Sequence, residues 1–93
     1  PLPMASVRTR HLLRLLPGAA LNEAAVLRLL ARAGVAVQRR AWGPAHAGAP
    51  TLLLITTPTP DAVAAHAVEL LQAYTGAQVR RLRMELCEAA ESP

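Results

Sequence analysis

The chain has 93 residues, 53% of them hydrophobic, so its length and composition allow one compact domain with a core and exclude a disordered chain. The formal net charge is +4 and all basic residues are arginine, but aromatic residues make up only 2%, which leaves almost nothing to stack on bases and argues against nucleic acid. Cys87 is the only cysteine, which excludes an internal disulfide and fits the reducing cytoplasm, the location we expect. No apolar run approaches the roughly 20 residues of a membrane span, so no membrane partner is expected.

The N-terminal segment, residues 1–10, contains two prolines followed by polar and basic residues and is predicted to be a linker. It has neither Met at position 1 nor a signal-peptide pattern, so we expect a piece of a longer protein. The apolar run over residues 11–16 ends at Pro17-Gly18, and its short length favours a strand.

A helix is predicted over residues 22–33. Apolar residues recur at the spacing of one helical face, Asn22 suits the N-cap, and Glu23 suits the positive end of the helix dipole. Gly34 follows the helix, where a left-handed glycine commonly ends one.

A strand over 35–42, a loop over 43–50 and a strand over 51–57 follow. The loop is predicted from two glycines and two prolines, and the second strand is apolar on both alternating faces. The next helix is expected to have Thr59 as its cap, Pro60 as its first residue and Gly76 as its end.

The last predicted strand is 79–86, with Leu82 and Met84 on one side and Arg81 and Arg83 on the other. Residues 87–93 are predicted to be a flexible tail.

The order strand, helix, strand, strand, helix, strand predicts an α+β fold of the ferredoxin-like βαββαβ type, in which two helices cover one face of a four-stranded antiparallel sheet. The domain proper is then 11–86. The other sheet face would expose Leu12, Leu16 and one side of the 52–56 strand, and this apolar surface predicts a homodimer.

The sequence indicates no catalytic or metal site. His11, His46 and His66 lack the helical spacing of a metal pair, and no nucleophile pattern such as GxSxG is present. We therefore expect no enzyme activity, no metal and no cofactor in this stretch of chain, and the residues alone indicate only a small binding or interaction module.

Three stretches resemble the C-terminal ACT domain of homoserine dehydrogenases. Residues 1–15 (PLPMASVRTRHLLRL) look like the segment with V-x-T-R and L-R-L that enters this domain. Ala33-Gly34-Val35-Ala36-Val37 is similar to the family's H-G-I-S-I, and Gln38 to Trp42 to its E-x-V-x-Q strand. Leu52 to Thr56, with Thr59 and 61–67, is similar to I-V-I-L-T-H-x-T-S-E-A-A. The resemblance covers nearly the whole chain.

The resemblance implies regulation by an amino acid, with threonine as the expected effector. The effector would bind near the turn between the first strand and the first helix. The resemblance implies that the effector contacts the turn residues Gly18, Ala19, Ala20, Leu21 and Asn22. It further implies a contact with Gln38 on the second predicted strand. It also implies a missing N-terminal oxidoreductase domain that binds NAD(P) and reduces aspartate semialdehyde to homoserine.

The turn departs from the family pattern. The family has D-R-P-G-V-L-A there, whereas Leu21 stands where the glycine is expected, Pro17-Gly18 is displaced toward the strand and the aspartate is absent. An ACT-like oligomerisation module without ligand binding is therefore the alternative, and the Arg clusters keep a nucleic-acid binder as a third hypothesis.

Overall fold

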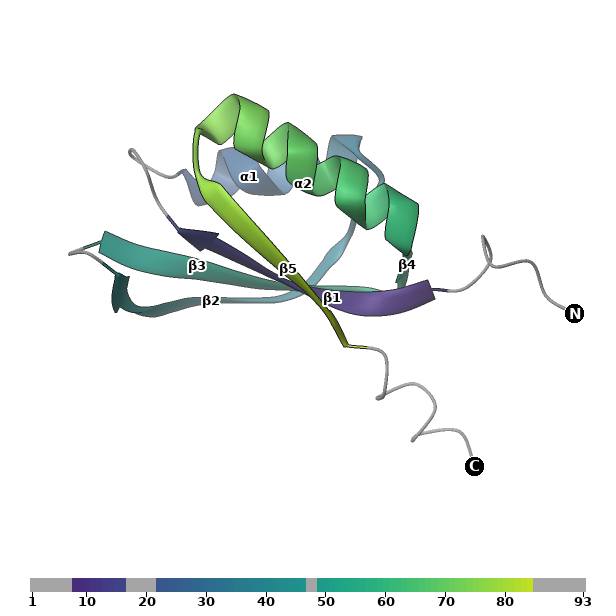
Figure 1. Cartoon of the computed structure of the whole chain (residues 1–93), viewed down its shortest axis with the longest axis horizontal. Coiled ribbons are helices and arrows are strands. Elements are labelled where there is room, and N and C mark those ends of the chain that lie inside the picture. Colours follow the sequence, from purple (N-terminus) through teal and green to yellow (C-terminus); the bar gives the residue numbers. More distant parts are fainter. Residues whose placement is uncertain (1–7, 17–21, 47–48, 85–93) are drawn as a thin grey trace, which may run out of the picture.

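The computed structural model describes residues 8–16, 22–46 and 49–84, and Figure 1 shows how their helices and strands are arranged. The elements, in chain order, are β1 (Arg8–Leu16), α1 (Glu23–Arg32), β2 (Val37–His46), β3 (Ala49–Thr56), β4 (Thr59–Pro60), α2 (Asp61–Thr75) and β5 (Gln78–Met84). Both helices lie on the same side of the sheet (Figure 1). The α+β class and the ferredoxin-like βαββαβ order are confirmed, with the two-residue strand β4 in addition.

The sheet has β1 at its centre. This strand pairs antiparallel with β3 on one side and with β5 on the other, so Leu12 lies between Ile55 and Leu82. Strand β2 pairs antiparallel with β3 on its far side. The resulting order β2-β3-β1-β5 leaves β2 and β5 at the two edges. β1 begins at Arg8, three residues inside the predicted linker.

Strand β4 extends the edge of β3 along β1. Leu12 pairs with Ile55 and Thr9 pairs with Thr59, so two residues of β1 lie opposite three on the other side, which is a bulge. The prediction that Thr59 caps α2 was wrong, because its hydroxyl donates to Thr57 O at 2.7 Å. The helix begins at Asp61, with Pro60 at the N-cap position.

Helix α1 has the ends that the sequence predicts. Asn22 is the N-cap, and its Oδ1 accepts a hydrogen bond from Ala25 N at 3.0 Å. Beyond the C-cap, Gly34 takes a φ of +86°, a conformation that costs glycine little. Val26 and Leu30 from the apolar face of the helix are fully buried.

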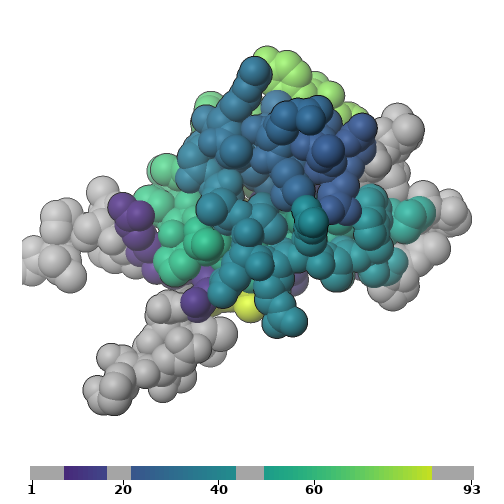
Figure 2. Space-filling model, turned by 180° about the vertical axis from the view of Figure 1, so that it is seen from behind, coloured from purple at the N-terminus to yellow at the C-terminus, as the bar shows by residue number. Residues whose placement is uncertain are grey.

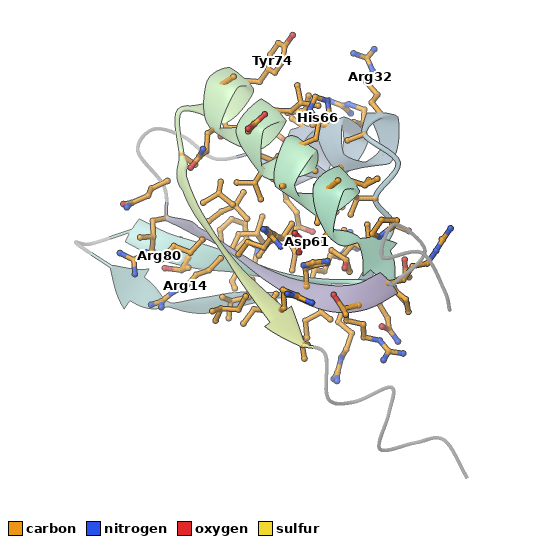
Figure 3. The ribbon with its side chains drawn as sticks, turned by 45° about the vertical axis from the view of Figure 1, so that its right-hand side comes forward. Arg14, Arg32, Asp61, His66, Tyr74 and Arg80 are labelled. Carbon is orange, nitrogen blue, oxygen red and sulfur yellow. The ribbon has the colours of Figure 1, made fainter. Side chains whose placement is uncertain are left out.

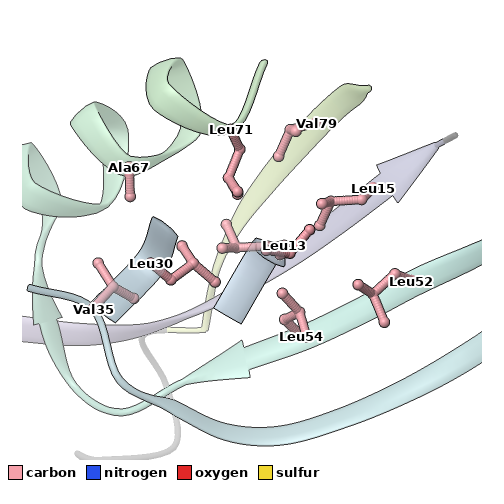
Figure 4. Close-up of a cluster of buried hydrophobic side chains, with 10 residues drawn as sticks. Leu13, Leu15, Leu30, Val35, Leu52, Leu54, Ala67, Leu71 and Val79 are labelled. Carbon is pink, nitrogen blue, oxygen red and sulfur yellow. The ribbon is translucent and has the colours of Figure 1, made fainter. Parts of the chain in front are cut away.

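The core lies between the helices and the sheet (Figure 4). Leucines from β1 and β3 meet side chains from α1, α2 and β5, and each buried Leu or Val contributes about 1.5–3 kcal/mol of burial. The buried members are Leu13, Leu15, Val26, Leu30, Val35, Leu52, Leu54, Ala67, Leu71 and Val79.

Two large side chains, Tyr74 on α2 and Leu82 on β5, lie outside the core. Tyr74 is 73% exposed, because α2 buries its small residues Ala64 and Ala67 together with Leu71. Leu82 on β5 is 61% exposed on the sheet face that carries no helix.

The hairpin between β2 and β3 is tighter than predicted. The expected loop over 43–50 is mostly strand, since β2 runs to His46 and β3 starts at Ala49. Pro44 is tolerated because β2 is an edge strand, where a missing N–H costs no sheet hydrogen bond. Leu16, expected on the open face, is also buried, because the alternation along β1 breaks at its last residue.

Candidate functional site

The predicted effector turn joins β1 to α1. Gly18, Ala19, Ala20 and Leu21 lie outside the described residues, so the described part of this site begins at Asn22. The Asn22 side chain is exposed, and its Oδ1 is already occupied by the cap bond to Ala25 N. Its amide nitrogen is the group that is left to donate to a ligand.

Next to Asn22, Glu23 joins helix α1 to strand β2. Its Oε1 accepts a hydrogen bond from Trp42 Nε1 at 2.9 Å, and its Oε2 lies 3.2 Å from Arg40 Nε. Trp42 stays 46% exposed. Figure 2 views the molecule from this side, with α1 above β2. A carboxylate and a guanidinium thus lie together beside the positive end of a helix dipole.

Sequence reasoning missed this cluster. The sequence pattern indicates Glu23 only as a favourable charge in the first turn of a helix. Arg40 and Trp42 are two apart on a strand and therefore share a face, which was the available signal. Nothing in the sequence, however, indicates that this face meets the start of α1, since the partners are 17 and 19 residues from Glu23.

Gln38 lies further along β2, at a β-bulge where Val37 pairs with Thr56 and Arg39 with Ile55. Its side chain is exposed and accepts a hydrogen bond from Arg10 Nε at 2.8 Å. Four residues separate it from Trp42, which is about 13 Å along a strand. The structure therefore places Asn22 and Gln38 near opposite ends of the α1–β2 contact.

A hollow of about 260 Å³ lies at the Gln38 end, and it is lined by Leu27, Val37, Gln38, Arg39 and Arg40. Arg40 belongs both to this hollow and to the ion pair with Glu23. The α1–β2 groove, defined as Asn22, Glu23, Leu27, Gln38 and Arg40, is the candidate functional site.

A second polar cluster surrounds the buried His11 on β1. The His11 ring is fully buried, with Nε2 at 3.3 Å from Thr59 O and Nδ1 at 3.4 Å from Arg81 Nη1. The same Arg81 nitrogen donates to Asp61 Oδ1 at 2.6 Å. Burial lowers the pKa of His11, and the hydrogen bond from Arg81 lowers that of Asp61. Because these groups bond to one another, the cluster links β1, α2 and β5.

Within residues 8–16, 22–46 and 49–84, no three His, Cys, Asp or Glu side chains gather as a metal site would require. None of the described helices is long and apolar enough to span a membrane. His66 lies exposed on α2.

Comparison with known proteins gives structural likenesses. No protein-family model matches the sequence, and a search of curated proteins finds no match. A homoserine dehydrogenase from Thiobacillus denitrificans matches with a TM-score of 0.66 and 25% identity, over 88% of this chain and 19% of that chain. The regulatory subunit of aspartate kinase from Thermus flavus matches with a TM-score of 0.55 and 24% identity, over 80% of this chain and 51% of that chain.

An uncharacterized protein from Thermotoga maritima matches with a TM-score of 0.60 and 14% identity, over 84% of this chain and 98% of its own length. The likenesses to the Thermus and Thermotoga proteins establish the fold. The chain spans 19% of the homoserine dehydrogenase, about the share of a single domain. Together these structures are consistent with an ACT-like domain, as the sequence resemblance implies.

Proposed function

We propose that this chain is an ACT-like regulatory domain that senses an amino acid, with threonine as the effector. The observation that carries the proposal is the match of 88% of the chain to a part of a homoserine dehydrogenase at 25% identity. The likeness to a regulatory subunit of aspartate kinase supports the same role. Both neighbours are named for enzymes of amino-acid metabolism, in which feedback by an amino acid is a natural regulation.

The parent protein in this proposal is a cytoplasmic homoserine dehydrogenase. Its remaining part would bind NAD(P) and reduce aspartate semialdehyde to homoserine, while residues 11–86 form the regulatory domain. The domain itself would contribute no catalytic residue and no cofactor site. The chain spans 19% of the matched enzyme, which leaves the larger part of such a protein for catalysis.

The chemistry of the α1–β2 groove supports an amino-acid ligand. A free amino acid carries an ammonium and a carboxylate on the same carbon, and Glu23 and Arg40 offer the two opposite charges 3.2 Å apart. The amide of Asn22 and the N–H groups that begin α1 add donors for a carboxylate. We propose that the turn residues Gly18, Ala19, Ala20 and Leu21 complete this site, with Gln38 at its far end.

The alternative is an oligomerisation module that has lost its ligand. One observation favours it: the Glu23 carboxylate already bonds Trp42 and Arg40, and the Oδ1 atom of Asn22 already caps its helix. Both the amino-acid-sensing domain and the oligomerisation module are expected to form a homodimer. The edge strands β2 and β5 carry backbone groups that a second copy can pair with, and Leu82 exposes apolar surface beside them.

Thermal unfolding with each of the twenty amino acids, at two chain concentrations, separates the two versions. A ligand at ten times its Kd stabilises the folded state by about 1.4 kcal/mol, or roughly 6–11 °C in a domain of this size. A shift with threonine that is lost in Glu23→Gln but kept in Glu69→Gln, a matched change on α2, supports sensing. A melting temperature that rises with chain concentration and with no amino acid supports the module without ligand.

A further inference from the structure

A second groove lies on the outer side of the helices, away from the sheet. It has a volume of about 320 Å³, at the low end of small-molecule sites, and is lined by Ala25, Arg28, Leu29, Arg32 and Tyr74. Four of these residues form one face of α1, at the spacing i, i+3, i+4 and i+7. Tyr74 comes from the last turn of α2. We call this surface the interhelical groove.

The two arginines of this groove lie one helical turn apart and leave their charges uncompensated. Arg28 and Arg32 are both exposed, and neither takes part in the ion pairs found among the described residues. Like charges at positions i and i+4 repel each other by a few tenths of a kcal/mol. An anion that binds both guanidinium groups removes this repulsion.

Tyr74 supplies the opposite wall. The phenol is 73% exposed although the ring is large and apolar, so burial in this core does not explain its position. Figure 3 shows Tyr74 and Arg32 projecting from different helices to the same side of the molecule, away from the sheet. The floor is formed by Ala25 and Leu29, which suit a short hydrocarbon body.

We infer that the interhelical groove binds a small organic dianion, such as a dicarboxylate or a phosphate monoester. Planar guanidinium groups bind the oxygens of carboxylate and phosphate in pairs, and the Tyr74 hydroxyl donates a further hydrogen bond. This site differs from the α1–β2 groove in place and in ligand charge, because the latter pairs an acid with a base. The inference does not depend on the effector proposed for that groove.

The test is an NMR titration of the whole ¹⁵N-labelled chain with malonate and with inorganic phosphate, at constant ionic strength set with NaCl. The expected result is a saturable shift centred on the amides of Ala25, Arg28, Arg32 and Tyr74, with a Kd in the low millimolar range. The double variant Arg28→Gln/Arg32→Gln should weaken binding at least tenfold, and Tyr74→Phe two- to fivefold.

The matched control is Arg14→Gln/Arg80→Gln, which removes the same charge from a cross-strand pair on the sheet. It should bind within a factor of two of the original chain. An equal loss in both double variants would overturn the proposal, since a site-specific interaction does not depend on distant charge. Chemical-shift changes that grow linearly with ligand concentration, or that NaCl alone reproduces, would also overturn the proposal. Amide spectra of each variant report whether it is folded.

Discussion

Lowering the pH from 7.5 to 5 is expected to destabilise the domain through His11. Arginine cannot accept a hydrogen bond, so the Nδ1 atom that faces Arg81 at 3.4 Å must be the acceptor and the ring proton lies on Nε2, toward Thr59 O. A second proton on Nδ1 would point at a guanidinium inside the protein. This arrangement is consistent with the lowered pKa of His11, whose first cause is burial.

The sign follows from the direction of that shift. The unfolded chain takes up the proton near pH 6.5 and the folded chain only at lower pH, so stability is full above 6.5 and is lost as the pH falls below it. Each unit by which the folded pKa lies below the unfolded pKa costs about 1.4 kcal/mol once both forms are protonated. One such unit lowers the melting temperature by roughly 6–11 °C. The carboxyl of Asp61, with its lowered pKa, titrates below this window.

Urea unfolding of the original chain, His11→Gln and His66→Gln between pH 5 and 7.5 measures the effect. Glutamine can donate to Thr59 O from nearly the position of Nε2 and does not titrate, so His11→Gln should flatten the pH dependence. His66→Gln, a change on the exposed side of α2, should leave the slope in place. The reasoning is refuted if the slope survives in His11→Gln, or if the original chain becomes more stable toward pH 5.

Three further substitutions test the packing and the helix ends by the same urea unfolding. Leu30→Ala should lower the free energy of unfolding by about 2–5 kcal/mol because the side chain is fully buried in the core. A loss below about 1 kcal/mol would contradict this burial. Gly76→Ala should cost about 1–2 kcal/mol from its φ of +71° alone, since a Cβ there meets no atom within 4 Å. Asn22→Ala should cost about 1 kcal/mol through the lost cap while Asn22→Asp changes little, and equal losses in both would contradict the cap bond.

The sequence predicts the elements of the fold well where local chemistry decides them. Asn22, Glu23 and Gly34 mark the ends of α1 because capping and left-handed glycine depend on neighbouring residues only. The short length of the 11–16 run likewise identifies β1, although this strand starts three residues earlier, at Arg8.

Long-range pairing accounts for what the sequence could not predict. Thr59 and Pro60 have the local pattern of a helix start, yet both pair with β1 because the edge of β3 continues past its bulge. The sequence placed Leu82 and Arg81 on opposite sides of the last strand but did not indicate which side meets the helices. In the structure the side that carries Arg81 faces α2, where Arg81 pairs with Asp61 and Val79 joins the core.

The candidate site was predictable only in part. Asn22 follows from its local capping pattern, and Gln38 was reached through the family resemblance. The Glu23–Arg40–Trp42 contact depends on how α1 lies across β2, which no local pattern encodes. Gln38 lies at a β-bulge that no local pattern of residues indicates.

The central claim is that the domain binds threonine at the start of α1. Isothermal titration of the whole chain with threonine, followed by NMR mapping of the shifts, tests it most directly. The account predicts saturable binding, with the largest shifts over residues 18–25 and at Arg40, and no saturable binding of serine or valine at the same concentration. The absence of heat and of shifts at tens of millimolar threonine would contradict it.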